Sequence, residues 1–301
     1  MPRLSVFLPN YNHGRHIGRA IEAIASQSRP PDELVIVDDG STDNSVSVIW
    51  QYAERYSWIR LVTNSNNRGV LKVLDECLPL LRGDYVFFAS ADDRILPGFF
   101  EAGLAAAARQ PNAGMVFGQI VAETDREEAL YTIKVRAWDT DVCAEPERFR
   151  RECLEAEPAG QSLVGSTLFR RQALAEVGGF RVELGSWCDS FAWRAVGLRY
   201  GVCYLPFPCM AWTIHAGSIS HAASRRPRHM FDIVRRGTAL MHSPEFRDDF
   251  PPEHVRRWQR GYYLIIIEHY VLSYLPQTWL TRMSRNRFFR YLRTTVVSVF
   301  S

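Results

Sequence analysis

Short apolar runs alternate with longer segments of helical spacing along the first 121 residues of this chain. The apolar runs are rich in β-branched and aromatic residues and have the length of strands: residues 4–9, 33–39, 58–64, 84–90 and 113–121. Between them, residues 15–27, 43–55 and 68–81 carry apolar side chains three or four positions apart, as amphipathic helices do. This alternation predicts an α/β fold with a mainly parallel sheet covered by helices.

Residues that favour the starts of helices support this parse. Ser41, Thr42 and Asp43 precede the second predicted helix, and their side chains are of the type that accepts hydrogen bonds from the first N–H groups of a helix. Pro97 follows the fourth predicted strand, and proline is favoured in the first helical turn. We therefore expect helices to begin near residues 43 and 97.

Composition excludes several classes of protein. With 301 residues, 47% of them apolar, the chain is long enough to bury a full core. Its six cysteines form neither a C-x-x-C pair nor a zinc-type spacing, and Met1 leads into a strand rather than a signal peptide. No apolar run approaches the roughly 20 residues that span a bilayer. We expect a cytoplasmic protein, with attachment to the inner face of the cell membrane as an option.

The net charge of +3 conceals an asymmetry between two parts of the chain. Residues 225–301 contain 14 arginines and 6 acidic residues, whereas residues 1–224 contain 22 basic and 27 acidic residues. A change of this kind indicates a domain boundary. We predict a main domain over 1–224 and a basic, aromatic-rich helical extension over 225–301.

The extension is predicted to form helices at 228–241, 254–275 and 278–293. The middle helix places Val255, Trp258 and Tyr262 on one apolar face. The last helix interleaves aromatic residues with arginines at 282, 285, 287, 290 and 293. Packing, oligomer formation and attachment to an anionic membrane surface all remain open for it. No nucleic-acid motif accompanies these arginines, so we do not expect nucleic acid as a partner.

Polar clusters follow three of the predicted strands at the point where each ends. These are Asn10-Tyr11-Asn12, Asp38-Asp39-Gly40 and Asp92-Asp93. Ligands of open parallel sheets bind outside the carboxyl ends of the strands. Four carboxylates gathered there would repel one another, which predicts a bound cation or a basic partner. Adjacent carboxylates suit Mg²⁺ or Mn²⁺, and such an ion would hold a diphosphate.

Each cluster also has a purely structural interpretation. Residues 39–42 are typical of a turn with a helix cap, Asp92-Asp93 of a solvated turn, and Tyr11 of packing. Only the combination of the three clusters at one edge of the sheet favours a ligand site.

These motifs resemble the family 2 glycosyltransferases, which have the GT-A fold and use nucleotide-diphospho-sugars. The resemblance covers residues 5–45, 66–101, 178–206 and 212–220, and it is most specific in the first segment, which contains "SVFLPNYN" and "VIVDDGSTDNS". It implies a Rossmann-like, mainly parallel GT-A sheet covered by helices.

The resemblance implies a nucleotide pocket lined by Pro9, Tyr11 and Asn12, with Tyr11 against the base. Asp39 would accept a hydrogen bond from the base, and Asp38 would support its turn. The family often has Arg-Asn in the helix after the third strand, where this chain has Leu74-Asp75. Arg68 or Lys72 is then expected to contact the phosphates instead.

The resemblance also implies a divalent metal, Mn²⁺ or Mg²⁺, at a D-x-D element. Asp92 matches the metal-binding last aspartate and Asp93 follows it, while Ser90 replaces the first aspartate and Ala91 fills the middle position. Ser90 and Ala91 are expected to contact the nucleotide. His215 matches a histidine that reaches the metal or the phosphates in several relatives. The replacement by Ser90 weakens the ribose or metal contact that the first aspartate makes in the family.

The segment "GSWCDSFAW" matches the family's Glu-Asp motif, whose aspartate is the general base. Here the base would be Asp189, and Cys188 replaces the glutamate as a small packing residue. Asp189 could also be only a helix N-cap. Trp187 and Trp212 are expected either to stack on the acceptor sugar or to lie in the core.

The resemblance thus implies an inverting glycosyltransferase that moves a sugar, with UDP as one expected carrier, to a hydroxyl of a glycan or lipid-linked glycan. Bacterial cell-surface polysaccharide synthesis is the expected setting. A dehydrogenase is excluded because G-x-G-x-x-G is absent after the first strand, where the chain reads "PNYNHG". A nucleotidyltransferase is disfavoured because it would show a basic glycine-rich loop there. A catalytically inactive relative that binds nucleotide sugars or glycans remains the alternative. The sugar, the base, the acceptor and the oligomeric state stay open.

Overall fold

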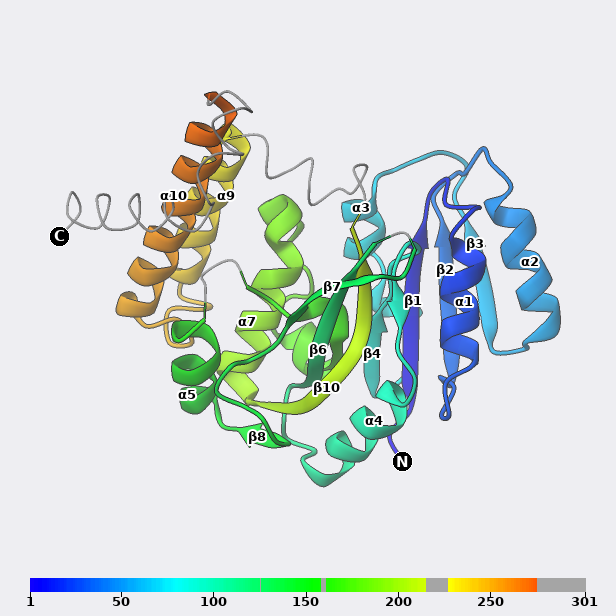
Figure 1. The fold of residues 1–301 in the computed structure, drawn as a ribbon, viewed down its shortest axis with the longest axis horizontal. Coiled ribbons are helices and arrows are strands. Elements are labelled where there is room, and N and C mark those ends of the chain that lie inside the picture. Colours follow the sequence, from blue (N-terminus) through cyan, green and yellow to red (C-terminus); the bar gives the residue numbers. More distant parts are fainter. Residues whose placement is uncertain (125, 158–160, 215–226, 275–301) are drawn as a thin grey trace. The chain divides into compact units, whose positions relative to one another are not determined.

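A computed structural model describes residues 1–274 except 125, 158–160 and 215–226 (Figure 1). The described residues fall into two compact units, the first ending at residue 214 and the second beginning at Pro227. The predicted domain boundary after residue 224 lies outside the described residues, so it stays a prediction.

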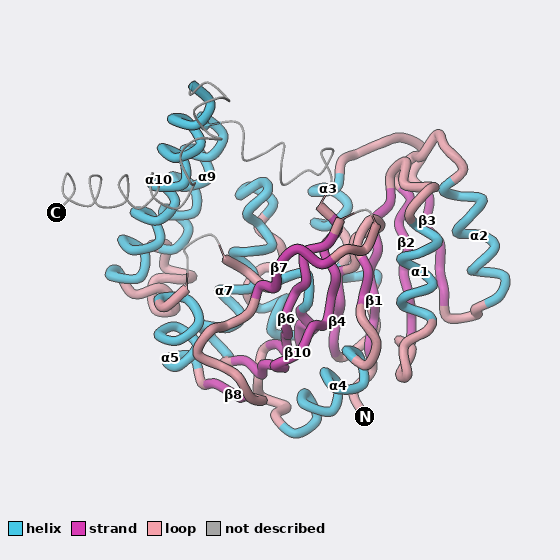
Figure 2. The backbone as a smooth tube through the Cα atoms, in the orientation of Figure 1, coloured by secondary structure: helices cyan, strands magenta, loops and turns pink. Residues whose placement is uncertain are grey.

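The first unit is built on one mixed sheet (Figure 2). Its strand order is β3 (Ile59–Thr63), β2 (Glu33–Asp38), β1 (Leu4–Asn10), β4 (Tyr85–Phe88), β9 (Thr167–Arg170), β6 (Met115–Glu123), β10 (Val202–Thr213) and β5 (Arg94–Ile95). β7 (Ala129–Ile133) pairs with β6, and β8 (Val142–Ala144) pairs with β10. The pairs among β3, β2, β1 and β4 are parallel, as is β6 with β10, while β9 is antiparallel to both of its neighbours.

Helices cover both faces of the parallel part of the sheet. On one face lie α1 (Ile17–Ala25), α2 (Ser45–Arg55) and α4 (Phe99–Arg109); on the other lies α3 (Val70–Asp75). Alternate residues of β1 serve the two faces: Val6 packs with Ile21 of α1, whereas Phe7 packs with Val73 of α3. This division follows from the period of two in a strand.

An aromatic cluster fixes α7 (Cys188–Tyr200) against the sheet. Phe117 of β6 lies 5.1 Å from Trp193 of α7 and 5.4 Å from Tyr204 of β10, measured between ring centroids. Phe149, in α5 (Pro146–Phe149), completes the contact, and a Cβ at Gly197 would lie only 2.3 Å from its ring. The short α6 (Arg171–Glu176) precedes this region. The start of α7 is therefore held in a defined place.

The five predicted strands and the first two helices are present, but the prediction of one helix over 68–81 is wrong. The structure has α3 over 70–75 and a separate 3₁₀ turn over 78–80. Gly69 has φ of +86°, outside the right-handed helical region, so the helix cannot begin before Val70. Pro79, which lacks an N–H group, prevents a continuous α-helix at the other end.

The two predicted helix starts lie close to the observed ones, because α2 begins at Ser45 and α4 at Phe99. The Asp43 carboxylate accepts a 2.9 Å hydrogen bond from the Ser45 N–H, as predicted for a residue before the helix, whereas the Ser41 hydroxyl donates to Asp38 instead. Pro97 lies outside α4, which begins after Gly98, a residue with φ of +82°.

The second unit contains α9 (Pro227–Met241) and α10 (Pro252–Tyr274), which pack on each other. Gln259 donates a 2.8 Å hydrogen bond to the Thr238 hydroxyl, and the rings of Phe231 and Tyr263 lie 5.8 Å apart. The predicted apolar face of α10 is buried at Val255, Trp258, Tyr262 and Ile266. The predicted helix over 278–293 is outside the described residues. Within the described part of the chain, no helix combines the length and apolar character needed to cross a membrane.

Candidate active site

β1 and β2 end side by side, and their last residues bind each other. Asn10 is the register partner of Asp38, and its side-chain amide donates a 2.7 Å hydrogen bond to the Asp38 carboxylate. The same carboxylate accepts hydrogen bonds from the N–H (2.9 Å) and the hydroxyl (2.6 Å) of Ser41. Asp38 is buried and therefore stabilises the turn that follows β2.

Asp39 connects this turn to the loop after β3. Its carboxylate accepts hydrogen bonds from the side chain of Asn64 (2.8 Å) and from the N–H groups of Arg68 (2.9 Å) and Gly69 (2.8 Å). A carboxylate has about four acceptor positions, and these bonds use three of them. Gly40 allows the two loops to approach, because it has φ of +75° and a Cβ there would lie 2.7 Å from the Asn66 carbonyl carbon.

Asn12 fixes the loop after β1 to the same turn. It has φ of +56°, a conformation that asparagine tolerates better than most residues. Its side-chain oxygen accepts hydrogen bonds from the N–H groups of Thr42 (2.8 Å) and Asp43 (3.3 Å). Tyr11 beside it is 40% exposed, and Pro9 precedes them in β1. An exposed ring thus stands next to a rigid set of turns.

We call Asn10, Asn12, Asp38, Asp39 and Asn64 the turn frame. Its two aspartates bind N–H, amide and hydroxyl donors, which compensate their charge within the protein. The expectation that four gathered carboxylates require a cation is therefore wrong for Asp38 and Asp39.

Arg68 and Lys72, the cations expected at the phosphates, both bind Glu76. The distances are 2.7 Å from Arg68 Nη2 and 3.0 Å from Lys72 Nζ to Glu76 Oε1. The hydrogen bond from Arg68, followed by that from Lys72, lowers the pKa of Glu76 to about 2. A diphosphate would have to compete with this carboxylate for either cation.

The loop after β4 carries the residues of the D-x-D element. The Ser90 hydroxyl donates a hydrogen bond to the Asp92 carboxylate, so the serine that replaces the first aspartate orients the last one. Ala91 is buried. Asp93 accepts a 3.0 Å hydrogen bond from the Thr213 N–H at the end of β10. Asp93 thereby joins this loop to the end of β10, and Asp92, at the position of the motif's last aspartate, is the candidate metal ligand.

The chemistry of this loop fits a metal that is shared with a ligand. Among the described residues, no three His, Cys, Asp or Glu side chains gather as a metal cage, and His215 is outside that set. Mg²⁺ usually takes one or two protein carboxylates and obtains its other ligands from phosphates and water. Asp92 can supply such a carboxylate.

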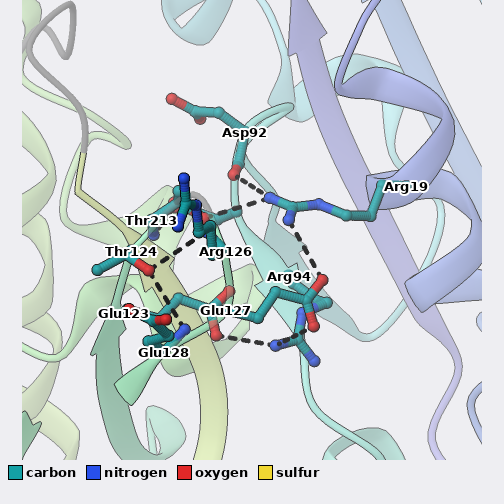
Figure 3. A network of polar contacts seen from close by, with 10 residues as sticks. Arg19, Asp92, Arg94, Glu123, Thr124, Arg126, Glu127, Glu128 and Thr213 are labelled. Carbon is teal, nitrogen blue, oxygen red and sulfur yellow. Dashed lines mark hydrogen bonds and ion pairs between the residues drawn. The ribbon is translucent and has the colours of Figure 1, made fainter. Parts of the chain in front are cut away.

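Arg19 of α1 reaches this loop and was missed by the sequence analysis. Its guanidinium donates hydrogen bonds to the Asp92 main-chain oxygen (3.1 Å) and to the Thr213 hydroxyl (3.3 Å), as Figure 3 shows. It also pairs with Glu127 at 3.5 Å. In the sequence Arg19 is only a polar position of an amphipathic helix, so no local signal distinguishes it.

Asp189 lies in the first turn of α7 and is not its N-cap, because the residue before the helix is Trp187. Its carboxylate accepts a 2.5 Å hydrogen bond from the Ser190 N–H. Burial raises the pKa of Asp189, and the Ser190 hydrogen bond and the charge of Arg194 oppose this effect without cancelling it. A raised pKa makes a carboxylate a stronger base.

Arg194 is a second residue without a sequence signal. It is 3% exposed and donates hydrogen bonds to the main-chain oxygens of Ser190 (3.0 Å) and Gln161 (2.9 Å). Its guanidinium also lies 5.7 Å from the centre of the Trp187 ring. Arg194 thereby joins the start of α7 to the segment at Gln161.

The two residues before Asp189, Trp187 and Cys188, are packing residues. Burial raises the pKa of the Cys188 thiol to about 12, which makes it a poor nucleophile. Trp187 is 4% exposed and packs edge-on against Phe191, so its burial argues against the predicted contact with an acceptor. Trp212 on β10 is partly exposed, so its contact with an acceptor sugar stays a prediction.

Comparison with known proteins adds independent evidence. A sequence model of the family described as glycosyl transferase family 2 matches residues 5–178. An uncharacterised protein of Mycobacterium tuberculosis (strain CDC 1551 / Oshkosh) is 27% identical over 94% of this chain and 89% of its own length. The uncharacterised glycosyltransferase YibD of Escherichia coli (strain K12) is 36% identical, over 33% of this chain and 28% of its own length.

Two solved structures share the fold. S. aureus TarS 1-349, solved in complex with UDP-GlcNAc, aligns with a TM-score of 0.69 at 16% identity and covers 88% of this chain and 73% of its own. Mannosyltransferase PcManGT from Pyrobaculum calidifontis, solved with GDP-Man and Mn²⁺, gives 0.59 at 19% identity, with 99% and 80% covered. The predicted GT-A fold is confirmed. Because the family model matches more than half of its residues, this chain belongs to glycosyl transferase family 2.

Proposed function

We propose that this protein is an inverting, metal-dependent glycosyltransferase. It would move a sugar from a nucleotide-diphospho-sugar to a hydroxyl of a glycan or lipid-linked glycan. The observation that carries the proposal is Asp189, a carboxylate of raised pKa at the rigid start of α7, in the position of the family's general base.

In this mechanism the turn frame holds the nucleotide and leaves the Tyr11 ring exposed for the base. The Asp92 carboxylate would bind the divalent cation, which when bound neutralises charge on the departing diphosphate. Asp189 removes the proton from the acceptor hydroxyl as that oxygen attacks the sugar. A single displacement inverts the anomeric configuration and forms no sugar–enzyme bond.

Known relatives support the donor class and the setting. TarS binds UDP and UDP-GlcNAc in its solved complexes, and PcManGT binds GDP-Man with Mn²⁺. Bacillus subtilis TuaG, 33% identical over 31% of this chain and 37% of its own length, is named for teichuronic acid biosynthesis. We therefore propose a UDP- or GDP-linked sugar as donor and cell-surface polysaccharide as product.

The test is a thermal-shift screen of UDP- and GDP-sugars with Mn²⁺ or a chelator, followed by nucleotide-release assays with an acceptor extract. A ligand that binds only the folded state raises its melting temperature. We expect one donor to stabilise the wild type in a Mn²⁺-dependent way, and Asp92→Ala to lose that dependence. Equal stabilisation with Mn²⁺ and with chelator would remove the metal from the proposal.

A second candidate is a binding protein that has lost turnover. It is favoured by the pairing of Arg68 and Lys72 with Glu76 and by the replacement of the motif's glutamate with buried Cys188. Tight donor binding without transfer or hydrolysis, across the acceptor extract, would support this candidate over the enzyme.

A further inference from the structure

Arg19 lies at the centre of a network that joins four parts of the chain (Figure 3). Its side chain, 30% exposed, extends from α1 to the Asp92 carbonyl after β4 and to the Thr213 hydroxyl at the end of β10. It also pairs with Glu127, in the turn between β6 and β7. One guanidinium thus touches both the candidate metal loop and the last residue of β10.

The network continues as an alternation of charges. Glu127 pairs with Arg94 at 3.3 Å, and Arg94 pairs at 2.8 Å with Glu123, whose side chain is 4% exposed. Arg94 follows directly after Asp92-Asp93, and Glu127 adopts φ of +62° in its turn. The Asp92 loop is therefore held at two points. Arg19 binds the Asp92 carbonyl, and Glu123 binds Arg94, the residue after Asp93.

These contacts differ from an ordinary surface ion pair. A partly exposed pair such as Arg19–Glu127 contributes little to stability by itself. Hydrogen bonds from a guanidinium to main-chain oxygens are charge-assisted and directional, so they restrain the acceptor's peptide plane. The plane restrained here is that of Asp92, whose carboxylate is itself oriented by Ser90.

We propose that Arg19 is a positioning residue, which fixes the Asp92 main chain against the end of β10 and so preorganises the Asp92 carboxylate for the cation–diphosphate pair. This inference rests on the proposed function of Asp92. The Nη2 atom of Arg19 donates to both the Asp92 carbonyl and the Thr213 hydroxyl, while Nη1 of the same planar guanidinium faces Glu127. The single nitrogen of a lysine cannot keep all three contacts, so Arg19→Lys does not replace it.

The experiment compares Arg19→Ala, Arg19→Lys and Thr213→Val with Asp92→Ala and with Arg15→Ala. Arg15 is an exposed arginine just before α1 and controls for the loss of one positive charge. Two quantities are measured in the full chain: hydrogen exchange of the 90–95 amides in metal-free protein, and UDP and GDP affinity with Mn²⁺ or chelator by calorimetry.

We expect Arg19→Ala to speed exchange at 90–95 and to weaken the Mn²⁺-dependent affinity by about tenfold, as loss of a residue that orients a ligand does. Arg19→Lys should behave like Arg19→Ala, Thr213→Val should show a smaller loss, and Arg15→Ala should match wild type. The chelator-insensitive part of the affinity should not change, because it belongs to the turn frame.

The outcomes separate this inference from the proposed function. If Asp92→Ala loses Mn²⁺-dependent affinity while Arg19→Ala keeps both the affinity and the exchange rates, Arg19 does not position Asp92. If wild type itself shows no Mn²⁺-dependent affinity, the metal role and this inference both fail. If Arg19→Ala melts at a much lower temperature, the role of Arg19 is judged from Arg19→Lys and Thr213→Val. Wild-type exchange rates and Mn²⁺-dependent affinity in both of these variants would contradict it.

Discussion

The turn frame and the Asp92 loop lie on the same unit but are held together differently. In the frame, aspartates and asparagines accept hydrogen bonds from N–H, amide and hydroxyl groups, mostly about 30 positions away in the chain. The Asp92 loop is instead bound by Arg19 of α1 across 73 positions, and Arg19 in turn binds Glu127 of the β6–β7 turn across 108 positions.

This difference distinguishes carboxylates that hold loops in place from a carboxylate suited to proton transfer. The carboxylates of Asp38 and Asp39 are largely used to hold the loops after β2 and β3 in place, and we propose that the resulting surface binds the nucleotide. Asp189 instead has a raised pKa, which means that its charged form is disfavoured in the fold. Substitutions in the frame should therefore reduce stability, and a substitution at Asp189 should reduce turnover.

The largest expected effect is that of Asp189→Asn on sugar transfer. Loss of a general base lowers the rate by about 10²–10⁴-fold, so turnover should fall by that factor while donor affinity stays the same. Nucleotide release and calorimetry measure the two quantities. Near-normal turnover would show that Asp189 is not the base.

The pH dependence of turnover should reveal the same group. Because the pKa of Asp189 is raised, its base form is lost on acidification at a higher pH than the ordinary value of 3.8. The folded state then binds more protons than the unfolded state, so Asp189 lowers stability as pH rises through that range. Asp189→Asn should therefore be at least as stable as wild type at neutral pH, with a difference that shrinks toward acid. Urea unfolding at two pH values measures this.

Asp39→Asn should affect stability first. Asparagine has one acceptor oxygen in place of two, so it cannot serve both the Asn64 side chain and the N–H groups of Arg68 and Gly69. Loss of a hydrogen bond to a charged group costs about 1.5–3 kcal/mol. The free energy of unfolding should fall by that amount, with weaker donor binding as a consequence. Asp248→Asn, at an exposed position, is the matched control. An unchanged unfolding midpoint for Asp39→Asn would show that the hydrogen bonds of Asp39 do not contribute to the stability of the fold.

Glu76→Gln should have a smaller effect. It frees Arg68 and Lys72 from their shared carboxylate, so UDP or GDP should bind about two- to fivefold more tightly at low salt. The gain should vanish at high salt because these groups are exposed. If affinity does not change at any salt concentration, neither cation serves the phosphates.

The extension should not affect the chemistry. We propose that its last segment binds anionic membrane surfaces, with each arginine near the surface contributing about 1 kcal/mol. Replacing the arginines at 282, 285, 287, 290 and 293 with glutamine should abolish co-sedimentation with anionic vesicles at low salt and leave transfer to a soluble acceptor intact. Failure of the unaltered full chain to bind the vesicles would favour packing or oligomer formation.

Several parts of the candidate site were predictable because their signals are local. The apolar runs predicted the strands, and residues 38–43 predicted a tight polar turn where β2 ends. The start of the third helix was not predictable, because it follows Gly69, whose φ of +86° accompanies a hydrogen bond from its N–H to Asp39, 30 positions away. The burial of Trp187 depends in the same way on Phe191 and Arg194 around it.

The sequence by itself determined the strand–helix alternation, the polar residues at the strand ends and the family, because each depends on neighbouring positions and on side-chain type. Only the tertiary structure decided which carboxylates are used for folding and which remain suited to chemistry. Asp93 faces Thr213, Asp189 has a raised pKa, and Arg19 reaches Asp92. Partners so far apart in the chain meet only in the folded sheet. Which charged groups at the site are paired is therefore a property of the folded state.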